Sequence, residues 1–574
     1  MFINIIVEMT TSVYKLRIPS RQETTFGVVD AYTLKDVPPP IGFTPFDHKM
    51  FNQDIFTYTD GNVEILHSSA RCMKVIPGVL VLANTSSFGR VKDKLLYKCI
   101  PDDKRIPIFL VPYKIKPGFN KNVKNKYVVF EFKEWTDKHP RGVLRQTIGD
   151  VDNLENFYEY QLYCKSLYAS IQNINKKAMK KLKATTEGEL TEYIIQNNHL
   201  IDVRETENIY TIDPLHSRDF DDAFSIQKSG HNHILNIYIS NVPFWMEILD
   251  LWDSFSNRIS SIYLPDRKRP MLPTVLSDAL CSLTEGDIRF ALRLSLTINT
   301  EFEIVSHKFE NCVIKVKKNL RYDTEEQENN EDYKKLLNVI KKMNRRKKYV
   351  DSINDSHDVI AYMMIIYNYL TAQKFITEGV GIFRSAQFKE TFVPPQNMPD
   401  GVKKFLKNWN STGGRYSKDI GTHDMLELDA YVHMTSPIRR LVDMLNMMVM
   451  LEKGGWTMSE KAVAFYNRWT SDSSIEYINT TMRSIRKVQN DCSLLKICMD
   501  DPTVQEKVYD GYIFDKLVRN DALYQYMVYL PEINMVNRFT SRYDKNNLSS
   551  QKFKIYVFID QHSLKRKIRV EVQE

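Results

Sequence analysis

The sequence predicts an α+β chain of several domains, with small β-barrels towards both ends and a mixed α/β region between them. Three observations support this fold class. The chain has 574 residues, which is too long for one ordinary domain, so about three or four units are expected. Short β-like runs broken by Pro, Gly and Asn occupy the first and last parts of the chain. Strand and helix periodicities alternate in the region between them.

The composition is that of a folded protein. Hydrophobic residues make up 43% of the chain and charged residues 26%, which excludes a largely disordered or fibrous protein. Only 20 glycines occur, about half the usual frequency, so glycine-rich phosphate-binding loops are not expected to carry the function. The formal charge of +8 fits a polyanionic partner, but it also fits an ordinary solvated surface.

The cysteines and the N-terminus indicate the compartment. The seven cysteines are scattered, odd in number and never arranged as CxxC, which favours reduced thiols over disulfides or a zinc site. The N-terminal stretch is interrupted by Glu8 and lacks the basic start and the cleavage site of a signal peptide. No apolar run reaches the roughly 18 residues that a membrane span needs. We therefore expect a soluble intracellular protein of the cytoplasm, with no membrane partner.

Two small barrels and a helical linker are expected in the first third of the chain. The barrels are assigned to residues 1–95 and 96–152, where runs such as Ile108–Tyr113 and Tyr127–Phe132 have the pattern of strands. From residue 153 the apolar spacing becomes helical and continues through a lysine-rich stretch, so residues 153–191 are predicted to be a helical linker. Its lysines either follow phosphates or form a solvated helix face, and the solvated face is the favoured interpretation.

The predicted central domain covers residues 192–503. Within it, an acidic run at 324–332 and a basic run at 341–348 surround a segment that we interpret as an exposed helical excursion. The tail at 504–574 returns to alternating strands and is predicted to form a last β-barrel.

The central domain begins with four aspartates within ten residues, Asp213, Asp219, Asp221 and Asp222. Carboxylates that lie close together in a folded site share protons or hold cations, and oxygen ligands alone favour magnesium or manganese. Two such ions, about 3.5–4 Å apart, can activate water and stabilise the departing oxygen in phosphodiester hydrolysis. An exposed acidic loop is the alternative. A calcium EF-hand is excluded, because Phe224 stands where that loop needs glycine.

Two further stretches carry a family resemblance. They are IYLPDRKRPMLPTVLSDALCSL at 262–283 and YVHMTSPIRRLVD at 431–443. Together with the acidic cluster, they resemble the three signature regions of the ribonuclease II family, also called the RNB family, which includes ribonuclease R and the eukaryotic exosome subunit. The resemblance covers residues 192–500, and it extends with less similarity to residues 134–155 and to the tail.

The resemblance implies both an architecture and a metal site. The architecture is a mixed α/β RNB catalytic domain flanked by OB-fold barrels, of cold-shock type at the N-terminal end and of S1 type at the C-terminal end. The four aspartates match the magnesium-binding aspartates of the family. Asp221 matches the one whose loss typically abolishes cleavage, and Asp221, Asp222 and Arg439 are the implied catalytic residues.

RNA-binding residues are implied in the same way. Tyr263 falls where the family holds the 3′-terminal nucleotide, and Tyr322 falls where a second aromatic residue contacts the RNA. Arg439 matches the arginine that touches the scissile phosphate, with Arg440 beside it and Arg384 as a further contact. Because stacking suits any base, degradation is expected to be largely independent of sequence.

The spacing around Arg439 gives independent support for a phosphate contact. Apolar residues between positions 438 and 449 trace one helix face, with Ser436 suited to cap the helix and Pro437 suited to its first turn. Arg439 would then stand near the N-terminus of a helix, where the helix dipole also favours a phosphate. The alternative is a pairing of Arg439 with Asp443, one turn further on.

The sequence departs from the family pattern at several supporting positions. Asn241 stands where the family has an acid, Tyr362 follows Ala361 where a pair of glutamates is usual, and Ala386 and Asn446 each replace a histidine. All four aspartates remain. We expect these departures to affect the rate or the length of the final product.

The function implied by the resemblance is 3′-to-5′ exoribonucleolytic hydrolysis of single-stranded RNA, processively, to nucleoside 5′-monophosphates. It would use a two-metal magnesium mechanism, with manganese as an alternative ion. Contacts with 2′-hydroxyl groups would exclude DNA. The rival is a catalytically inactive RNB-fold protein that binds RNA or regulates translation, and an endonuclease is a weaker alternative. A monomer is expected, and no protein partner is indicated.

Overall fold

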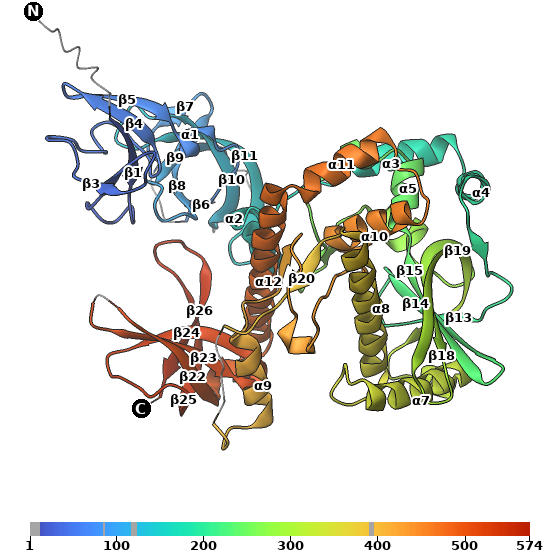
Figure 1. Cartoon of the computed structure of the whole chain (residues 1–574). Helices are drawn as coiled ribbons and strands as arrows, with labels where there is room; N and C mark the ends of the chain where they lie inside the picture. Colours follow the sequence, from blue (N-terminus) through green and yellow to red (C-terminus); the bar gives the residue numbers. More distant parts are fainter. Residues whose placement is uncertain (1–11, 84–86, 116–122, 390–394, 520, 574) are drawn as a thin grey trace, which may run out of the picture. The chain divides into compact units, whose positions relative to one another are not determined.

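The computed structural model describes residues 12–83, 87–115, 123–389, 395–519 and 521–573 (Figure 1). The signal-peptide prediction concerns an N-terminal stretch whose first eleven residues lie outside this range. Contacts divide the chain into two units, one formed by residues 1–168 with 490–574 and the other by residues 169–489. Within the described residues, no helix combines the length and the apolar composition that a membrane span requires. All seven cysteines are free thiols, as their scatter in the sequence predicted.

The first unit begins with a five-stranded antiparallel sheet in the order β3-β2-β1-β4-β5. Its strands are β1 (Val13–Arg17), β2 (Gly27–Asp30), β3 (Asp36–Val37), β4 (Ile55–Thr59) and β5 (Asn62–His67). Leu16, Val28 and Phe56 are buried in the small core of this sheet. A short helix, α1 (Ser69–Cys72), follows.

A second sheet in this unit has the order β6-β10-β11-β9-β8-β7 and closes into a barrel because β6 also pairs with β8. Its strands are β6 (Ile76–Leu80), β7 (Arg90–Val91), β8 (Lys94–Pro101), β9 (Phe109–Tyr113), β10 (Lys126–Glu134) and β11 (Arg141–Asp150). Strands β9 and β10 confirm the two strands predicted here.

The boundary between these two sheets differs from the expected one. The first sheet ends at His67 and the second begins at Ile76, so the division lies well before residue 95. Pro77 and Gly78 weaken the strand signal in the sequence, yet both lie inside β6. A side chain on Gly78 would come within 2.9 Å of the Ile100 carbonyl oxygen on β8, so glycine permits the close pairing of the two strands.

The predicted helical linker is three helices. They are α2 (Leu154–Cys164), α3 (Gln172–Ala184) and α4 (Glu187–Asn197). Helix α2 belongs to the first unit, where Tyr160 stacks on Tyr127 of β10 with ring centroids 4.3 Å apart, whereas α3 and α4 belong to the second unit. Helix α3 buries Ile174 and Ala178, and most of its lysines face solvent.

The chain ends in a five-stranded antiparallel sheet in the order β24-β23-β22-β25-β26, as the alternating pattern of the tail predicted. Its strands are β22 (Val508–Val518), β23 (Tyr524–Leu530), β24 (Met535–Ser541), β25 (Ser550–Ile559) and β26 (Arg566–Val572), preceded by α13 (Thr503–Glu506). Tyr526, Phe539 and Phe553 pack together in its core.

The second unit is built on a six-stranded mixed sheet in the order β12-β19-β13-β14-β15-β18, in which β19 also pairs with β18. Its strands are β12 (Ile201–Asp202), β13 (Ile209–Asp213), β14 (Asp222–Ser229), β15 (Asn232–Ser240), β18 (Ile288–Ile298) and β19 (Ile304–Arg321). Strand β13 runs parallel to β19 with Asp213 opposite Arg321. The last residue of β13 therefore lies beside the residues that follow β19.

Helices cover this sheet and complete its core, and in Figure 1 α8 and α10 run along one side of it. The helices that follow the sheet strands in this part of the chain are α5 (Val242–Ile248), α6 (Glu325–Asn329), α7 (Glu331–Arg346), α8 (Ser356–Glu378), α9 (Asp400–Trp409), α10 (Leu441–Lys453), α11 (Glu460–Thr470) and α12 (Asp472–Asp500), and of these α6 and α9 add no residue to the main core. Short strands form two further pairs, β16 (Ile262–Tyr263) with β17 (Lys268–Arg269) and β20 (Phe383–Ser385) with β21 (Arg415–Ser417).

Two expectations about this region need correction. The excursion around α7 is helical, but it is not merely exposed, because Tyr333, Leu336 and Ile340 on one face of the helix are buried in the main core. The second unit also ends earlier than residue 503, because residues from Asn490 onward, including the end of α12, make their contacts within the first unit.

Candidate active site

The four aspartates lie where β13 ends and β14 begins. Asp213 is the last residue of β13, Asp222 is the first of β14, and the other two lie in the loop between these strands. Two hydrogen bonds of the Ser282 hydroxyl hold this loop, because it accepts from the Phe220 N–H at 3.0 Å and donates to the Arg218 carbonyl at 2.8 Å. The first and second signature stretches are therefore joined directly.

A cavity of about 520 Å³ opens beside this loop. It brings together most of the residues predicted from the sequence. Its lining includes Asp213, Asp219, Asp221, Asp222, Tyr263, Tyr322, Arg439 and Arg440. The remaining lining residues include Ser217, His357, Asn368, Tyr431, His433 and Ser436. The three signature stretches thus meet around one space.

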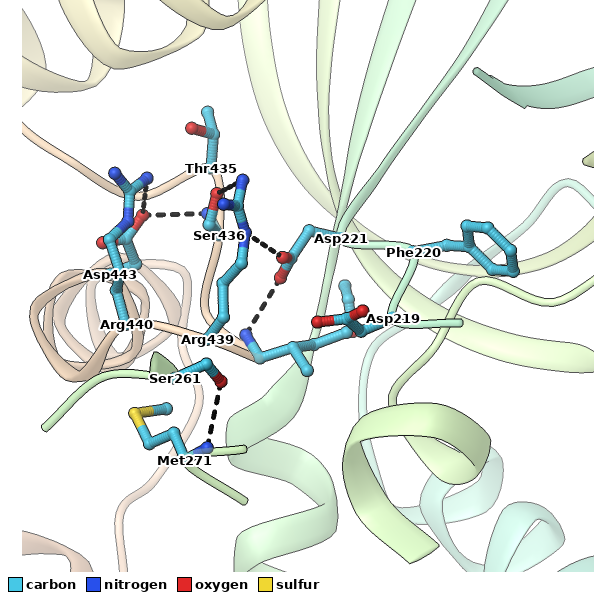
Figure 2. A network of polar contacts seen from close by, with 12 residues as sticks. Asp219, Phe220, Asp221, Ser261, Met271, Thr435, Ser436, Arg439, Arg440 and Asp443 are labelled. Atoms are coloured by element: carbon cyan, nitrogen blue, oxygen red, sulfur yellow. Dashed lines mark hydrogen bonds and ion pairs between the residues drawn. The ribbon is translucent and has the colours of Figure 1, made fainter. Parts of the chain in front are cut away.

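Asp221 is the most enclosed of the four carboxylates, with only 2% of its surface exposed (Figure 2). The Arg439 Nε donates to Asp221 Oδ2 at 3.0 Å, and the Ile438 N–H donates to Oδ1 at 2.9 Å. The Arg439 Nη2 also donates to the Ser436 hydroxyl at 2.9 Å. Arg439 is therefore held in place while 43% of its side chain stays exposed.

Arg440 binds a different carboxylate. Its Nη2 donates to Asp443 Oδ1 at 2.8 Å, and the Asp443 side chain is fully buried. The same Asp443 oxygen accepts from the Ser436 N–H at 2.8 Å (Figure 2). The pairing with Asp443 that was the alternative for Arg439 is therefore made by its neighbour.

The helix expected to begin at Pro437 begins later, and Ser436 does not cap it. Residues 437–439 form a turn, and α10 begins at Leu441 with Arg440 in extended conformation before it. The cause is tertiary pairing, because Arg440 forms a β-bridge with Ser260 and the Leu441 N–H donates to the Ile259 carbonyl. Arg439 thus points from a turn, and the helix-dipole argument for its phosphate contact does not hold.

Asp219 lies beside Lys268 and Tyr263. Lys268 Nζ is 3.0 Å from Asp219 Oδ1 and 3.1 Å from Asp278 Oδ1, so one ammonium group bridges two carboxylates. The Tyr263 hydroxyl donates to Asp219 Oδ2 at 3.4 Å, and 42% of this residue is exposed. A ring held at the cavity in this way has surface available for stacking.

Three of the cavity carboxylates, Asp213, Asp221 and Asp222, resist ionisation. Burial raises the pKa of Asp221 to about 7 although Arg439 opposes the shift, and burial raises the pKa of Asp222 to about 6 against the same arginine. The pKa of Asp213 is raised well above its ordinary value by burial and then by the neighbouring Asp222. Negative charge in this cavity is thus incompletely compensated.

This donor set fits a divalent cation. The Asp213 Oδ2 atom is buried and has no hydrogen-bond partner in the described structure. Oxygen donors with excess negative charge favour a hard cation such as magnesium. Within the described residues, however, no three acidic, histidine or cysteine side chains are arranged so that they could hold one metal ion as they stand. Asp219 and Asp221 are instead bound by Lys268 and Arg439.

Arg384 does not line the cavity, unlike the other predicted RNA contacts. Its guanidinium lies over the Tyr416 ring at 5.6 Å, and the Tyr416 hydroxyl lies 2.8 Å from His433 Nδ1. Burial and then the nearby Arg440 lower the pKa of His433 well below its ordinary value, so this lining imidazole is neutral. Arg384 is therefore one layer behind the cavity wall.

The positions that depart from the family pattern also lie outside the cavity lining. Asn241 caps α5 by accepting from the Phe244 N–H, and Tyr362 is buried on α8, away from the lining residues of that helix. Ala386 is buried beside His423. Asn446 accepts from the Ile382 N–H at 2.8 Å and donates to the Ile382 carbonyl at 3.0 Å. Each departure thus has a structural role in this fold.

Sequence reasoning assigned no role to several residues that line the cavity or contact its aspartates. Lys268 and His433 stand inside the quoted signature stretches, so their positions were visible although no role was assigned to them. His357 and Asn368 come from α8, which carries no signature stretch that would have indicated them.

Comparisons with known proteins agree with this architecture. The family model for the RNB domain matches residues 201–349, and the model for the Dis3-like cold-shock domain 2 matches residues 96–160. Ribonuclease R of Chlamydia pneumoniae is 23% identical over 412 residues, which cover 58% of this chain and 59% of that protein. Ribonuclease R of Escherichia coli is 24% identical over 311 residues, which cover 41% of this chain and 38% of that protein. The chain thus spans less than two thirds of the length of these relatives.

Solved structures share the fold. Mycoplasma genitalium RNase R in complex with ribose methylated single-stranded RNA superposes with a TM-score of 0.67 at 15% identity, covering 97% of this chain and 100% of that one. Yeast Ssd1, described as a pseudonuclease, gives a TM-score of 0.55 at 15% identity, covering 92% of this chain and 78% of that one. At these identities the likeness concerns the fold alone.

Proposed function

We propose that this chain, which carries an RNB domain and a Dis3-like cold-shock domain and is similar to ribonuclease R, is a 3′-to-5′ exoribonuclease. It hydrolyses single-stranded RNA processively and releases nucleoside 5′-monophosphates. The observation that carries this proposal is the cavity in which the four aspartates, Tyr263, Tyr322 and Arg439 meet.

The arrangement of Arg439 suits a phosphate contact. Nε is bound to Asp221 and Nη2 to Ser436, so two of its three nitrogens orient the guanidinium plane. Nη1 has no protein partner in the described structure and is available to an RNA phosphate at the cavity. Because the guanidinium plane is held before RNA arrives, little side-chain freedom is lost on binding.

The four aspartates are the residues that would hold magnesium, with manganese as an alternative. When bound, such an ion would lower the pKa of an attacking water and stabilise the departing oxygen. The aspartates supply the negative charge that attracts it, and Tyr263 offers a ring for the terminal base. Contacts with the ribose 2′-hydroxyl would discriminate RNA from DNA.

A second candidate function is RNA binding without hydrolysis. Two observations favour it: Lys268 and Arg439 bind two of the four carboxylates, and a pseudonuclease shares the fold. Against it, all four aspartates are present and line one cavity. We therefore retain the hydrolytic function as the conclusion.

Digestion of a defined RNA tests this proposal. Purified full-length chain is incubated with 5′-labelled single-stranded RNA and magnesium, and products are resolved by length. The expected result is loss of the full-length RNA to short 5′-labelled end products with few intermediates, as processive shortening from the 3′ end requires, and protection by a blocked 3′ end. Asp221→Asn serves as the control that keeps the side-chain shape. Binding without magnesium-dependent shortening would favour the inactive alternative, and cleavage despite a blocked end would indicate an endonuclease.

A further inference from the structure

Two aromatic rings stack at the edge of the candidate active site. The Tyr322 ring and the His357 imidazole have centroids 3.8 Å apart and an angle of 10° between their planes. The two residues are distant in sequence, because Tyr322 follows β19 and His357 lies in the first turn of α8. Both line the cavity. At this separation no base can enter between them.

The two rings differ in how much surface they offer. Tyr322 is half-buried and packs against the main hydrophobic core. His357, in contrast, leaves 56% of its side chain exposed. The ring that presents a free face at this part of the cavity is therefore the imidazole, with the phenol ring behind it.

Local contacts fix the position of His357. The Asp355 side chain caps α8 by accepting from the Asp358 N–H at 3.0 Å. Asp323, the residue after Tyr322, accepts from the Ser356 hydroxyl at 3.4 Å and lies 3.5 Å from His357 Nε2. Asp323 thus joins the two segments that carry the rings, and the stack is a built feature rather than the position of one free side chain.

We propose that His357 is the RNA-binding residue on which a base near the 3′ end stacks, and that Tyr322 acts as its support. This inference rests on the proposed function, because it takes the cavity to hold the 3′ end of an RNA. A planar imidazole backed by a second ring gives a base a rigid face without reading its edges, so the contact is tolerant of sequence. The family resemblance assigned the RNA contact to Tyr322 and gave no role to His357.

Fluorescence of a modified base tests this assignment. An RNA with 2-aminopurine at the 3′ end is titrated with the full-length chain in the absence of magnesium, so that no shortening occurs. Stacking on a ring quenches the fluorescence. Loss of a stacking contact weakens affinity by roughly 5- to 150-fold, and His357→Ala is expected to fall in this range and to lose the quenching. His357→Phe, which keeps a ring, should restore both.

A matched control is His231→Ala, since His231 is exposed in the turn that joins β14 to β15. This turn lies roughly 25 Å along the hairpin from Asp222, so the variant should bind and quench like the unchanged protein. A thermal melting curve, followed by circular dichroism on a separate sample of each variant, shows that the variant is folded.

The outcomes separate this inference from the proposed function. Quenching that is unchanged in His357→Ala but lost in Tyr322→Ala would overturn it, because the base would then stack on the tyrosine. Absence of quenching with the unchanged protein would overturn it as well. If the unchanged protein quenches through His357 but never shortens RNA with magnesium, the stacking contact stands and the hydrolytic function fails.

Discussion

Arg439 and Arg440 are neighbours in sequence, yet they bind different carboxylates and are expected to serve different purposes. Arg439 binds Asp221 in the cavity and keeps an exposed part, whereas Arg440 is paired with the fully buried Asp443. A charge that is buried and paired is costly to leave alone. Arg440 therefore contributes mainly to the fold, and Arg439 contributes to the site.

Arg440→Met is predicted to destabilise the protein. The substitution leaves the Asp443 carboxylate buried without its cation, and the other Asp443 oxygen already has no partner in the described structure. Stranding a buried charge costs about 3–5 kcal/mol. Urea unfolding followed by circular dichroism measures this cost. A loss of stability well under 1 kcal/mol would contradict the structural role.

Arg439→Lys is predicted to impair activity while leaving the fold intact. Lysine keeps a positive charge near Asp221 but cannot make the paired Nε and Nη2 bonds that orient the guanidinium. The rate of RNA shortening should fall by about 10- to 100-fold, with urea unfolding nearly unchanged. Full activity in this variant would show that the orientation of the guanidinium is unimportant.

For single residues, sequence analysis predicted the site residues that belong to the signature stretches. It missed residues that only the folding of distant segments brings to the site. Asp221 and Arg439 stand 218 positions apart and are joined by an ion pair, which the matching of signature stretches implied. His357 carries no such mark, because only the course of α8 brings it against Tyr322. Lys268 was visible as a basic residue, but its contact with Asp219 requires the β16–β17 turn.

At the scale of the elements, one buried carboxylate links three strands of the central sheet in the second unit. Glu207 accepts hydrogen bonds from Ser225 on β14 and from Asn236 and Tyr238 on β15. It also pairs with Arg293 on β18 at 2.7 Å, and both side chains are buried. One side chain thus connects three neighbouring strands, including the strand that begins at Asp222.

Glu207→Gln is predicted to loosen this sheet. The substitution removes the negative charge that pairs with Arg293, which is buried and would be left with only Glu310. We expect a loss of about 3 kcal/mol in unfolding free energy, measured by urea denaturation. Lys418→Gln, which breaks the exposed pair with Asp472 at 3.0 Å, is the matched control and should have a far smaller effect. Equal effects of the two substitutions would contradict the account.

Element boundaries show where local sequence signals fail. The apolar spacing after Pro437 is helical, yet bridging of Arg440 to Ser260 delays the start of α10 to Leu441. In the first unit, the partners of β6 lie on β8 and β10, so its place in the second barrel could not be inferred from its own residues. In both cases a tertiary pairing overrides the local pattern.

For the whole molecule, two histidines near the cavity are predicted to make stability depend on pH. Burial lowers the pKa of His423 to about 4, and burial followed by Arg440 lowers the pKa of His433 well below its ordinary value. In the unfolded chain both titrate near 6.5. As pH falls below about 6.5, the unfolded state takes up protons that the folded state does not. The contribution of these two histidines to stability is therefore complete above this pH and is lost as pH falls, whereas the raised pKa values of Asp221 and Asp222 contribute with the opposite sign.

The expected slope is up to about 1.4 kcal/mol per pH unit for each histidine. The difference in unfolding free energy between the unchanged protein and a histidine variant, followed by urea unfolding from pH 5 to pH 8, measures it. His423→Phe removes one titrating group and keeps a ring beside Tyr431, which His423 contacts with centroids 5.1 Å apart. This variant should show a shallower decline at acid pH. An identical pH profile for the variant would exclude His423 as a cause.

The overall order of β-rich ends and a mixed centre was predictable from strand and helix periodicity, because that signal is local. The division into two units was not. Residues from Asn490 onward join the N-terminal barrels rather than the centre, and contacts at such sequence distance leave no local signal. The pairing of β19 with both β12 and β18 likewise could not be predicted from the sequence.

The proposed function requires that the aspartate cavity cleaves the last phosphodiester of an RNA. Single-turnover cleavage of an RNA labelled at its 3′-terminal internucleotide phosphate tests it most directly, with protein in excess and magnesium added. We expect the first labelled product to be a nucleoside 5′-monophosphate, and we expect Asp221→Asn to bind the RNA but release none. A longer labelled fragment as first product, or equal release by Asp221→Asn, would contradict it.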